Sequence, residues 1–185
     1  MMAQAPFLPN EIWLAITEHC DLRDAWLSLR QVNKQLHDCV DQHFAEDILP
    51  RTVISLPIAL PTYDVRNPQI GKALLDHHSR LVGTGKRGSI DRAVYSLLRV
   101  EPAQYRAQLL SRWNSMQYYE DDQLNEKLRW DMRLGHANIR VQLKDARIST
   151  REDVDRERAC LAVDWKPTLT YFFRRIHPGQ IDWSW

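Results

Sequence analysis

The sequence predicts a mainly α-helical protein: an N-terminal three-helix unit, a helical C-terminal unit and at most one short strand between them. Three observations predict this class. Apolar residues recur at helical spacing in residues 10–44, prolines and glycines gather in residues 57–88, and the helical spacing returns after residue 90. Because proline and glycine interrupt regular structure, the middle stretch is interpreted as a connection between two helical regions.

Three short helices are expected in the first fifty residues. The first covers residues 10–19, directly after Leu8 and Pro9. Proline suits the first turn of a helix, where its missing N–H is not needed. The second helix covers residues 22–29, and the third covers residues 32–44, in which an apolar residue recurs at every fourth position. Helices this short are marginal alone in water, so they must pack on one another or on a partner.

The middle of the chain has a weaker pattern. Residues 51–56 alternate and are rich in β-branched side chains, which predicts a short strand. Residues 57–68 contain three prolines and are expected to form a loop. Residues 69–81 fit a helix of moderate amphipathicity, and residues 83–88 fit a flexible basic loop.

The last half of the chain predicts helices throughout. Residues 90–100 and residues 102–116 have apolar residues at helical spacing, and Pro102 suits the start of the second of these helices. Residues 124–148 predict a long amphipathic helix. A further helix is expected over residues 149–163, because it opens with Ser-Thr-Arg-Glu, the form of a capping box. Residues 165–176 are expected to form the last helix.

We therefore divide the chain into residues 7–50, a connection of residues 51–89, and a helical unit of residues 90–185. The charge distribution supports two units with different surfaces. Residues 1–50 hold three basic and eight acidic side chains, whereas the whole chain has a net charge of +1. The remainder of the chain is therefore basic.

One string near the N-terminus carries a motif, FLPNEIWLAITEHCDLRDAWLSLRQVNKQLHDCV. It opens with Leu-Pro-x-Glu-Ile and has an apolar residue one turn later. A short Asp-Leu segment, then Leu-Arg-x-Val-x-Lys and a closing apolar position follow. In order and spacing this string resembles the F-box, and the resemblance covers residues 7–44. The residues after it make the chain look most like fungal F-box proteins.

The resemblance implies a partner as well as a fold. An F-box docks a Skp-type adaptor and thereby joins a cullin–RING ubiquitin ligase, while the rest of the protein recruits a protein substrate. The implied protein is a substrate receptor and not an enzyme, with no catalytic residue, metal or cofactor. Three short helices also expose more apolar side chain than they can bury among themselves, which is typical of an interaction site. The residues implied in adaptor binding are Leu8, Pro9, Ile12, Ile16, Leu22, Trp26, Leu29, Arg30, Val32 and Leu36.

Two other functions stay open. One is an F-box-like scaffold or inhibitor that occupies the adaptor outside a ubiquitin ligase, since no WD or leucine-rich repeat follows residue 50. The other is a small helical nucleic-acid-binding module, although acidic residues at Asp131 and Asp145 interrupt the basic pattern. The basic residues in question are Arg99, Arg106, Arg112, Lys127, Arg129, Arg133, Arg140, Lys144 and Arg147.

The sequence indicates no catalytic or metal site. Residues 83–89 (GTGKRGS) lack the G-x-x-x-x-G-K-[ST] spacing of a phosphate-binding loop. His77 and His78 are adjacent, and adjacent side chains on a helix point about 100° apart, so they do not share a metal. The acidic residues 120–122 fit the start of a helix, where carboxylates oppose the positive end of the dipole.

Cysteine usage and hydropathy bear on the compartment. The three cysteines form no CxxC pair, so we expect neither a zinc site nor a disulfide framework. This favours a reducing compartment, the cytoplasm or the nucleus. No signal-peptide pattern opens the chain, and no stretch approaches the ~20 apolar residues of a membrane span.

Overall fold

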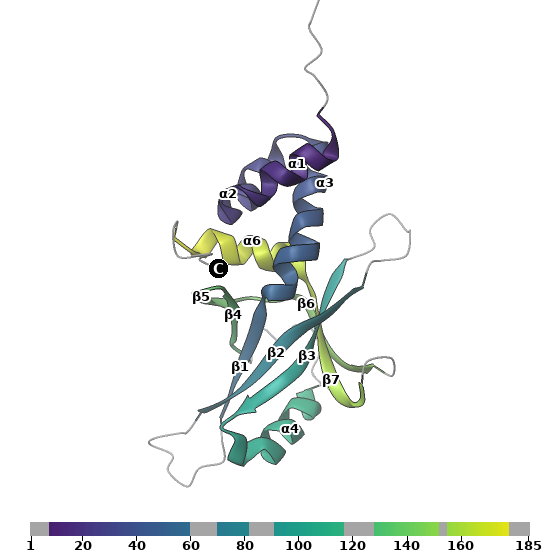
Figure 1. The fold of residues 1–185 in the computed structure, drawn as a ribbon. Coiled ribbons are helices and arrows are strands. Elements are labelled where there is room, and N and C mark those ends of the chain that lie inside the picture. The colour runs from purple at the N-terminus through teal and green to yellow at the C-terminus, as the bar shows by residue number, and fades with distance from the viewer. Residues whose placement is uncertain (1–7, 60–69, 82–90, 117–127, 152–154, 178–185) are drawn as a thin grey trace, which may run out of the picture. The chain divides into compact units, whose positions relative to one another are not determined.

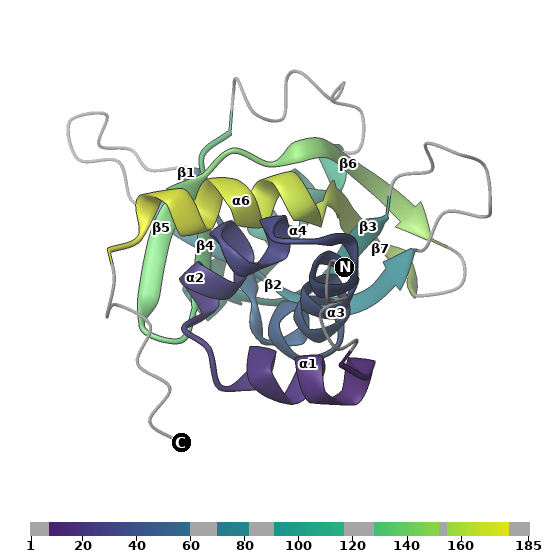
Figure 2. The same ribbon diagram turned by 90° about the horizontal axis from the view of Figure 1, so that it is seen from above.

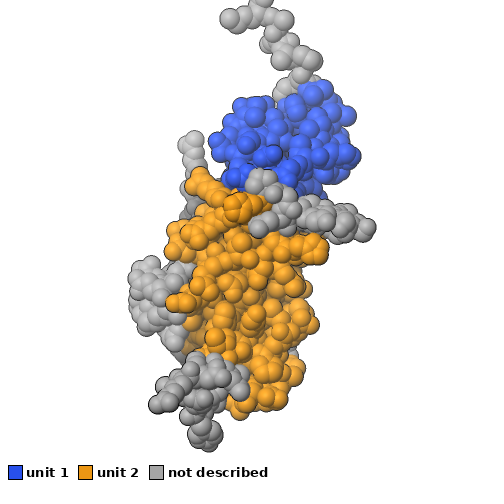
Figure 3. All heavy atoms as spheres, turned by 90° about the vertical axis from the view of Figure 1, so that its left-hand side faces the viewer, with its two compact units in different colours: residues 1–49 blue, residues 50–185 orange. Residues whose placement is uncertain are grey.

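The computed structural model describes residues 8–59, 70–81, 91–116, 128–151 and 155–177. The chain divides into two compact units, Met1–Leu49 (unit 1) and Pro50–Trp185 (unit 2). Figure 3 colours unit 1 blue and unit 2 orange. Each unit has its own architecture, helical in the first and built on a sheet in the second.

Unit 1 is made of short helices (Figure 1). They are α1 (Asn10–Glu18), α2 (Leu22–Leu27), the 3-10 turn η1 (Leu29–Gln31), α3 (Lys34–His43) and the π-helical turn η2 (Phe44–Ile48). A further 3-10 turn, η3 (Leu49–Arg51), spans the boundary between the units. The three helices expected at the N-terminus are present.

Side-chain caps explain where two of these helices begin. The carboxylate of Asp21 accepts hydrogen bonds from the backbone N–H groups of Arg23 and Asp24, at 2.9 and 3.1 Å, and starts α2. The amide oxygen of Asn33 accepts from the N–H of Leu36 at 2.8 Å and starts α3. Such caps satisfy N–H groups that have no partner within the first turn of a helix.

Unit 2 is built on a seven-stranded antiparallel sheet with the order β5-β4-β1-β2-β3-β7-β6. β1 to β3 form its centre, and the later strands extend it on both sides. The strands are β1 (Val53–Ala59), β2 (Ile70–Leu81), β3 (Arg92–Glu101), β4 (Trp130–Leu134), β5 (Ala137–Val141), β6 (Lys144–Arg151) and β7 (Asp155–Asp164).

Chain connectivity makes this sheet curl. The two edge strands, β5 and β6, follow each other along the chain, and only Gln142 and Leu143 separate them. A link this short brings the two edges of the sheet together at that end. Figure 2 shows the strands of unit 2 arranged around a curved path. Leu143 is fully buried, which anchors the link in the interior.

Two helices pack on the curled sheet. α4 (Arg106–Ser115) follows the 3-10 turn η4 (Ala103–Tyr105) and contacts β2, β3 and β7. α6 (Trp165–Arg175) contacts β5, β6 and β7, and Figure 1 shows the two helices at opposite ends of the sheet. Gly71 permits the close approach of α4, because a Cβ there would lie 2.9 Å from the carbonyl oxygen of Glu101 and 3.0 Å from Leu109.

Large aromatic side chains fill the interior of unit 2. Trp113 of α4 and Trp130 of β4 meet edge to face, with ring centroids 6.5 Å apart. Phe172 and Phe173 of α6 are fully buried. The buried hydroxyl of Tyr95 lies 2.8 Å from the hydroxyl of Thr52, which satisfies both groups. Aromatic residues bury much area each, so they dominate the energetics of this core.

The prediction of a mainly α protein with at most one strand is wrong. The helices expected at residues 102–116 and 165–176 and the strand expected at residues 51–56 are present. However, residues 70–81 and 92–101, which were assigned to helices, are the two central strands β2 and β3.

Bulges explain the error at β2 and β3. The register between these strands shifts at Leu74/Leu75 and again at His77/Ser79. A bulge inserts one residue and resets the two-residue alternation of inward and outward side chains. In addition, Ala93, Val94 and Tyr95 are buried in succession. The resulting apolar pattern in β3 imitates helical spacing.

The long helix expected at residues 124–148 and the helix expected at residues 149–163 are also wrong. From residue 128 to residue 148, the first of these regions forms β4, β5 and the start of β6. Gly135, with a positive φ of 58°, lies in the two-residue turn between β4 and β5. The Ser-Thr-Arg-Glu pattern does not start a helix, because β6 continues to Arg151 and pairs with β7.

Candidate functional site

Exposed apolar side chains distinguish α1. Ile12 is 46% exposed, Ile16 is 38% exposed, and Pro9 before the helix is also exposed. Positions 9, 12 and 16 share one side of a helix, because residues three or four apart are neighbours on its surface. Val32, which follows η1, is 66% exposed. Unit 1 therefore presents β-branched apolar residues to solvent without covering them.

Hydrogen bonds from α3 hold the start of α1. The side-chain amide of Gln35 donates to the carbonyl oxygen of Leu8 at 2.8 Å and to the amide oxygen of Asn10 at 2.7 Å. These bonds join residues far apart in the sequence and fix the Leu8–Pro9 segment against α3. Sequence reasoning missed Gln35, because no local pattern marks a polar side chain whose partners lie 25 or more positions away.

Arg30 links α2, η1 and α3 of unit 1. Its guanidinium binds Asp41 of α3 through two hydrogen bonds, at 2.5 and 3.3 Å, and lies 4.4 Å from the centre of the Trp26 ring. The planar guanidinium suits a two-point contact with a carboxylate and stacking on an aromatic face at once. Trp26 in turn packs on Phe44, with ring centroids 4.7 Å apart. This chain of contacts joins α2, η1 and α3.

The ten residues implied in adaptor binding fall into three groups by exposure. Leu22, Trp26 and Leu36 are buried, and Leu8, Leu29 and Arg30 are half-buried. The exposed members are Pro9, Ile12, Ile16 and Val32. Exposed members are able to touch a partner directly, whereas buried ones act by holding the helices in place. That these residues bind an adaptor stays a prediction.

Titratable groups in unit 1 suggest no reaction. Burial raises the pKa of the Cys39 thiol, and the nearby carboxylates of Asp38 and Glu11 raise it further. A thiol that stays protonated is a poor nucleophile. His43 and Asp47 lie one helical turn apart, 3.0 Å between ring nitrogen and carboxylate oxygen. In the described part of the chain, no group of three or more His, Cys, Asp or Glu residues could hold a metal ion.

Three other features of the sequence were considered as possible sites. His77 and His78 lie on β2 at the second bulge, and neither belongs to a group of three or more His, Cys, Asp or Glu residues that could hold a metal ion among the described residues. Residues 83–89 and the acidic residues 120–122 lie outside the described residues. No helix among the residues that the structure describes is long and apolar enough to span a bilayer.

The basic residues of unit 2 do not form one helical stripe. They come from β3, α4, β4, β5 and β6, and several are paired with acids. Arg99 lies 3.1 Å from Glu101, and Arg140 lies 3.7 Å from Asp131. Lys127 lies outside the described residues.

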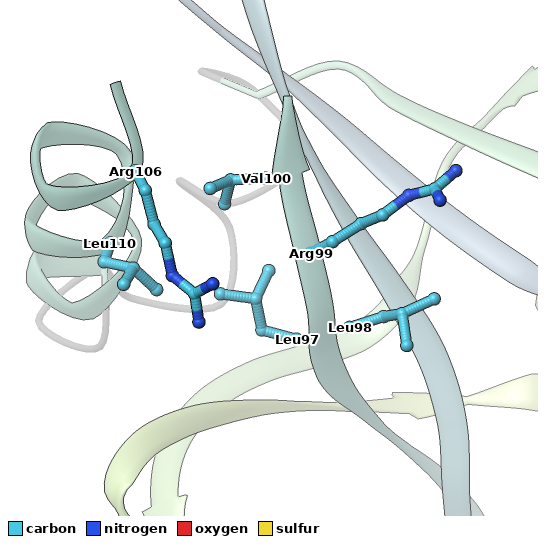
Figure 4. Close-up of a pocket in the computed structure, with 6 residues that line it drawn as sticks. All are labelled: Leu97, Leu98, Arg99, Val100, Arg106 and Leu110. Atoms are coloured by element: carbon cyan, nitrogen blue, oxygen red, sulfur yellow. The ribbon is translucent and has the colours of Figure 1, made fainter. Parts of the chain in front are cut away.

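The crevice between β3 and α4 is too small for a ligand. Figure 4 shows Leu97, Val100, Arg106 and Leu110 converging in it, while Leu98 and Arg99 point away. Its volume is about 10 Å³. That is space for about one water molecule, so the crevice is no substrate site.

Comparison with protein families decides what unit 1 is. The family model of the F-box domain matches residues 6–44, which contain α1, α2 and α3. These residues are an F-box domain. F-box domains bind Skp-type adaptors, so the match suggests an adaptor-binding role of the kind found in Skp–cullin–F-box ubiquitin ligases. F-box proteins are typically non-catalytic substrate receptors.

The match is to the domain in general, and likeness to fungal members stays a prediction. The comparison with curated proteins gives no match, and neither does the comparison with solved structures. The F-box domain is therefore the part of the chain whose family is known, and unit 2 rests on its structure alone.

Proposed function

We propose that this protein is the substrate-recognition subunit of a Skp–cullin–F-box ubiquitin ligase, with the F-box domain on the adaptor and unit 2 on the substrate. The observation that carries the proposal is the F-box domain with Ile12, Ile16 and Val32 exposed on it. Burying a whole isoleucine side chain contributes about 1.5–3 kcal/mol. Covering three partly exposed β-branched residues gives an adaptor a substantial driving force.

The polar contacts inside the F-box domain support the same proposal. Gln35 holds the Leu8–Pro9 segment, and the pair of Arg30 and Asp41 holds η1 against α3. Both contacts order the backbone beside exposed apolar residues before a partner arrives. A surface that is ordered beforehand loses less conformational entropy on binding.

Unit 2 is the proposed receptor. It has a core of its own and covers more than two thirds of the chain. Ubiquitin transfer belongs to other subunits in this proposal, so the chain needs no catalytic group. Cys20, Cys39 and Cys160 are not joined in disulfides, which fits the reducing cytoplasm or nucleus.

Adaptor binding is tested with an exposed apolar position. In the full chain, we expect Ile12→Asp to weaken binding of a purified Skp-type adaptor at least about tenfold, because a carboxylate would be buried against apolar surface. Isothermal titration calorimetry measures the affinity. Leu98→Asp is the matched control, since Leu98 is 57% exposed but lies on β3 of unit 2.

Two outcomes would count against the proposal. Equal adaptor affinity for Ile12→Asp and the unchanged chain would exclude α1 as the docking surface, provided that circular dichroism shows both to be folded. Co-purification of the adaptor without a cullin, from cells with normal ligase levels, would favour the scaffold or inhibitor over the substrate receptor.

A further inference from the structure

A recess lies where four segments of unit 2 meet. It is bounded by the end of β1, the start of β2, the last turn of α4 and the residues just before β4. Its volume is about 430 Å³, within the range of about 300–1,000 Å³ that is usual for ligand pockets. The lining residues are Pro57, Ile58, Ala59, Ile70, Arg112, Ser115, Met116, Leu128 and Arg129.

The walls of this recess are mostly apolar. Ile70, the first residue of β2, is 61% exposed. Pro57 and Leu128 beside it are half-buried. An exposed apolar patch that borders a hollow is typical of a surface that another molecule covers.

The charged groups among the described residues of the recess have one sign. Arg112 and Arg129 both line it, and the other described lining residues are uncharged. Arg112 donates to the carbonyl oxygen of Ala59, which positions its guanidinium, and a guanidinium carries five N–H donors in all. The recess is therefore complementary to an anion beside an apolar group.

The shape of the surface favours a chain segment over a small molecule. A second shallow recess of about 470 Å³ runs over α4 and is lined by Ala107, Gln108, Ser111 and Arg112. Arg112 lines both recesses, and the two recesses together are called the track. An open track does not enclose a metabolite, but it suits an extended peptide. None of the described residues that line either recess is aromatic, so these residues offer no ring on which a nucleic-acid base could stack.

We propose that this track binds an acidic segment of the substrate protein, with an apolar side chain against Ile70 and Asp or Glu carboxylates at Arg112 and Arg129. The inference rests on the proposed function, because it names the chemistry of the substrate that unit 2 recruits. Arginine suits this task, since its fork of N–H groups pairs with carboxylates at two points.

Peptide selection tests the proposal. The full chain, bound to its adaptor, is screened against a bead library of random seven-residue peptides. We expect enrichment of sequences that combine Asp or Glu with Leu, Ile or Met. A selected peptide is then synthesised and its affinity is measured by fluorescence anisotropy. Arg129→Glu should weaken its binding about tenfold or more, because the introduced carboxylate repels the carboxylates of the peptide. Ile70→Ser should also weaken it.

Matched controls come from the same sheet. Arg133→Glu on β4 and Leu98→Ser on β3 replace exposed residues away from the recess, and each should change affinity less than about twofold. Enrichment of basic or purely apolar peptides would overturn the inference, as would an equal effect of Arg133→Glu and Arg129→Glu. Binding of a single-stranded RNA oligonucleotide that Arg129→Glu abolishes, without peptide binding, would overturn it too.

Failure of the inference is distinguishable from failure of the proposed function. If the adaptor binds but no acidic peptide is selected, the substrate chemistry is wrong and the adaptor role stands. If acidic peptides are selected by the free chain but no adaptor binds, the track is real and the ligase role is wrong.

Discussion

The two units of this protein are stabilised in different ways. The F-box domain joins short helices through specific polar contacts, such as Gln35 to Leu8 and Arg30 to Asp41, and leaves Ile12 and Val32 in solvent. Unit 2 packs more large aromatic side chains, inside a curled sheet, whereas the F-box domain buries Trp26 and Phe44. The difference teaches that the first unit depends on a small core and a few polar contacts, whereas the second depends on an extensive core. Four predictions test this comparison.

The largest effect is expected in the core of unit 2. Trp113→Ala removes a fully buried ring that meets Trp130 edge to face, and should lower the free energy of unfolding by about 3–5 kcal/mol. Urea denaturation, followed by the circular dichroism of the sheet, measures it. We expect adaptor affinity to be retained under native conditions. Loss of adaptor binding together with the sheet would show that the units are not independent in function.

The next effect concerns the polar contacts of the F-box domain. Arg30→Ala removes the two hydrogen bonds to the largely buried carboxylate of Asp41 and the stacking on Trp26. We expect a loss of about 2 kcal/mol in the free energy of unfolding of the F-box domain. Arg30→Lys is the control, and it should recover only part of the loss because lysine lacks the planar fork. Full recovery by lysine would reduce the role of Arg30 to its charge.

A smaller effect is expected at the start of α3. Asn33→Ala removes the cap on the N–H of Leu36 and should cost about 1 kcal/mol. Asn33→Asp keeps an acceptor oxygen in the same place and should preserve stability. Thermal unfolding of the unchanged chain, Asn33→Ala and Asn33→Asp measures the differences in stability. Equal melting temperatures for Asn33→Ala and the unchanged chain would show that α3 does not depend on this cap.

The smallest effect is a pH dependence in unit 2. Burial lowers the pKa of His77, and nearby His78 and Arg80 lower it further, while Asp76 opposes the change. The unfolded chain therefore binds a proton more readily than the folded one. Stability is complete above about pH 6.5, the ordinary histidine value, and falls as pH decreases below it. His77→Gln should flatten the stability profile between pH 7 and pH 5. An unchanged slope in chemical denaturation would contradict this.

Sequence reasoning succeeded where the determinants are local. The motif from Leu8 to Val40 occupies one short stretch, and the F-box that it predicts is confirmed. The sequence did not show which motif residues turn inward, because the burial of Leu36 depends on tertiary packing.

The sheet was missed because its pattern is not local. The bulges beside Leu75 and Ser79 are properties of a strand pair, and neither strand shows them alone. One signal was available in Trp130, Met132 and Leu134, which alternate and lead into Gly135, the pattern of a strand before a turn. The recess at Ile70 could not be predicted, because it joins segments whose proximity depends on the sheet order.

The order of the strands has a consequence for synthesis of the protein. β1, β2 and β3 are consecutive in the chain and lie together at the centre of the sheet, while β4 to β7 extend it on both sides. Domains fold largely as units during synthesis, and the N-terminal end leaves the ribosome first. The F-box helices and then the central meander emerge first, so β4 and then β5 meet strands that are already available, whereas β6 precedes its partner β7. Because β7 and α6 come last, the free edge of β3 is the last of the central meander to be paired, and a pause in translation before residue 155 would leave it exposed to other chains.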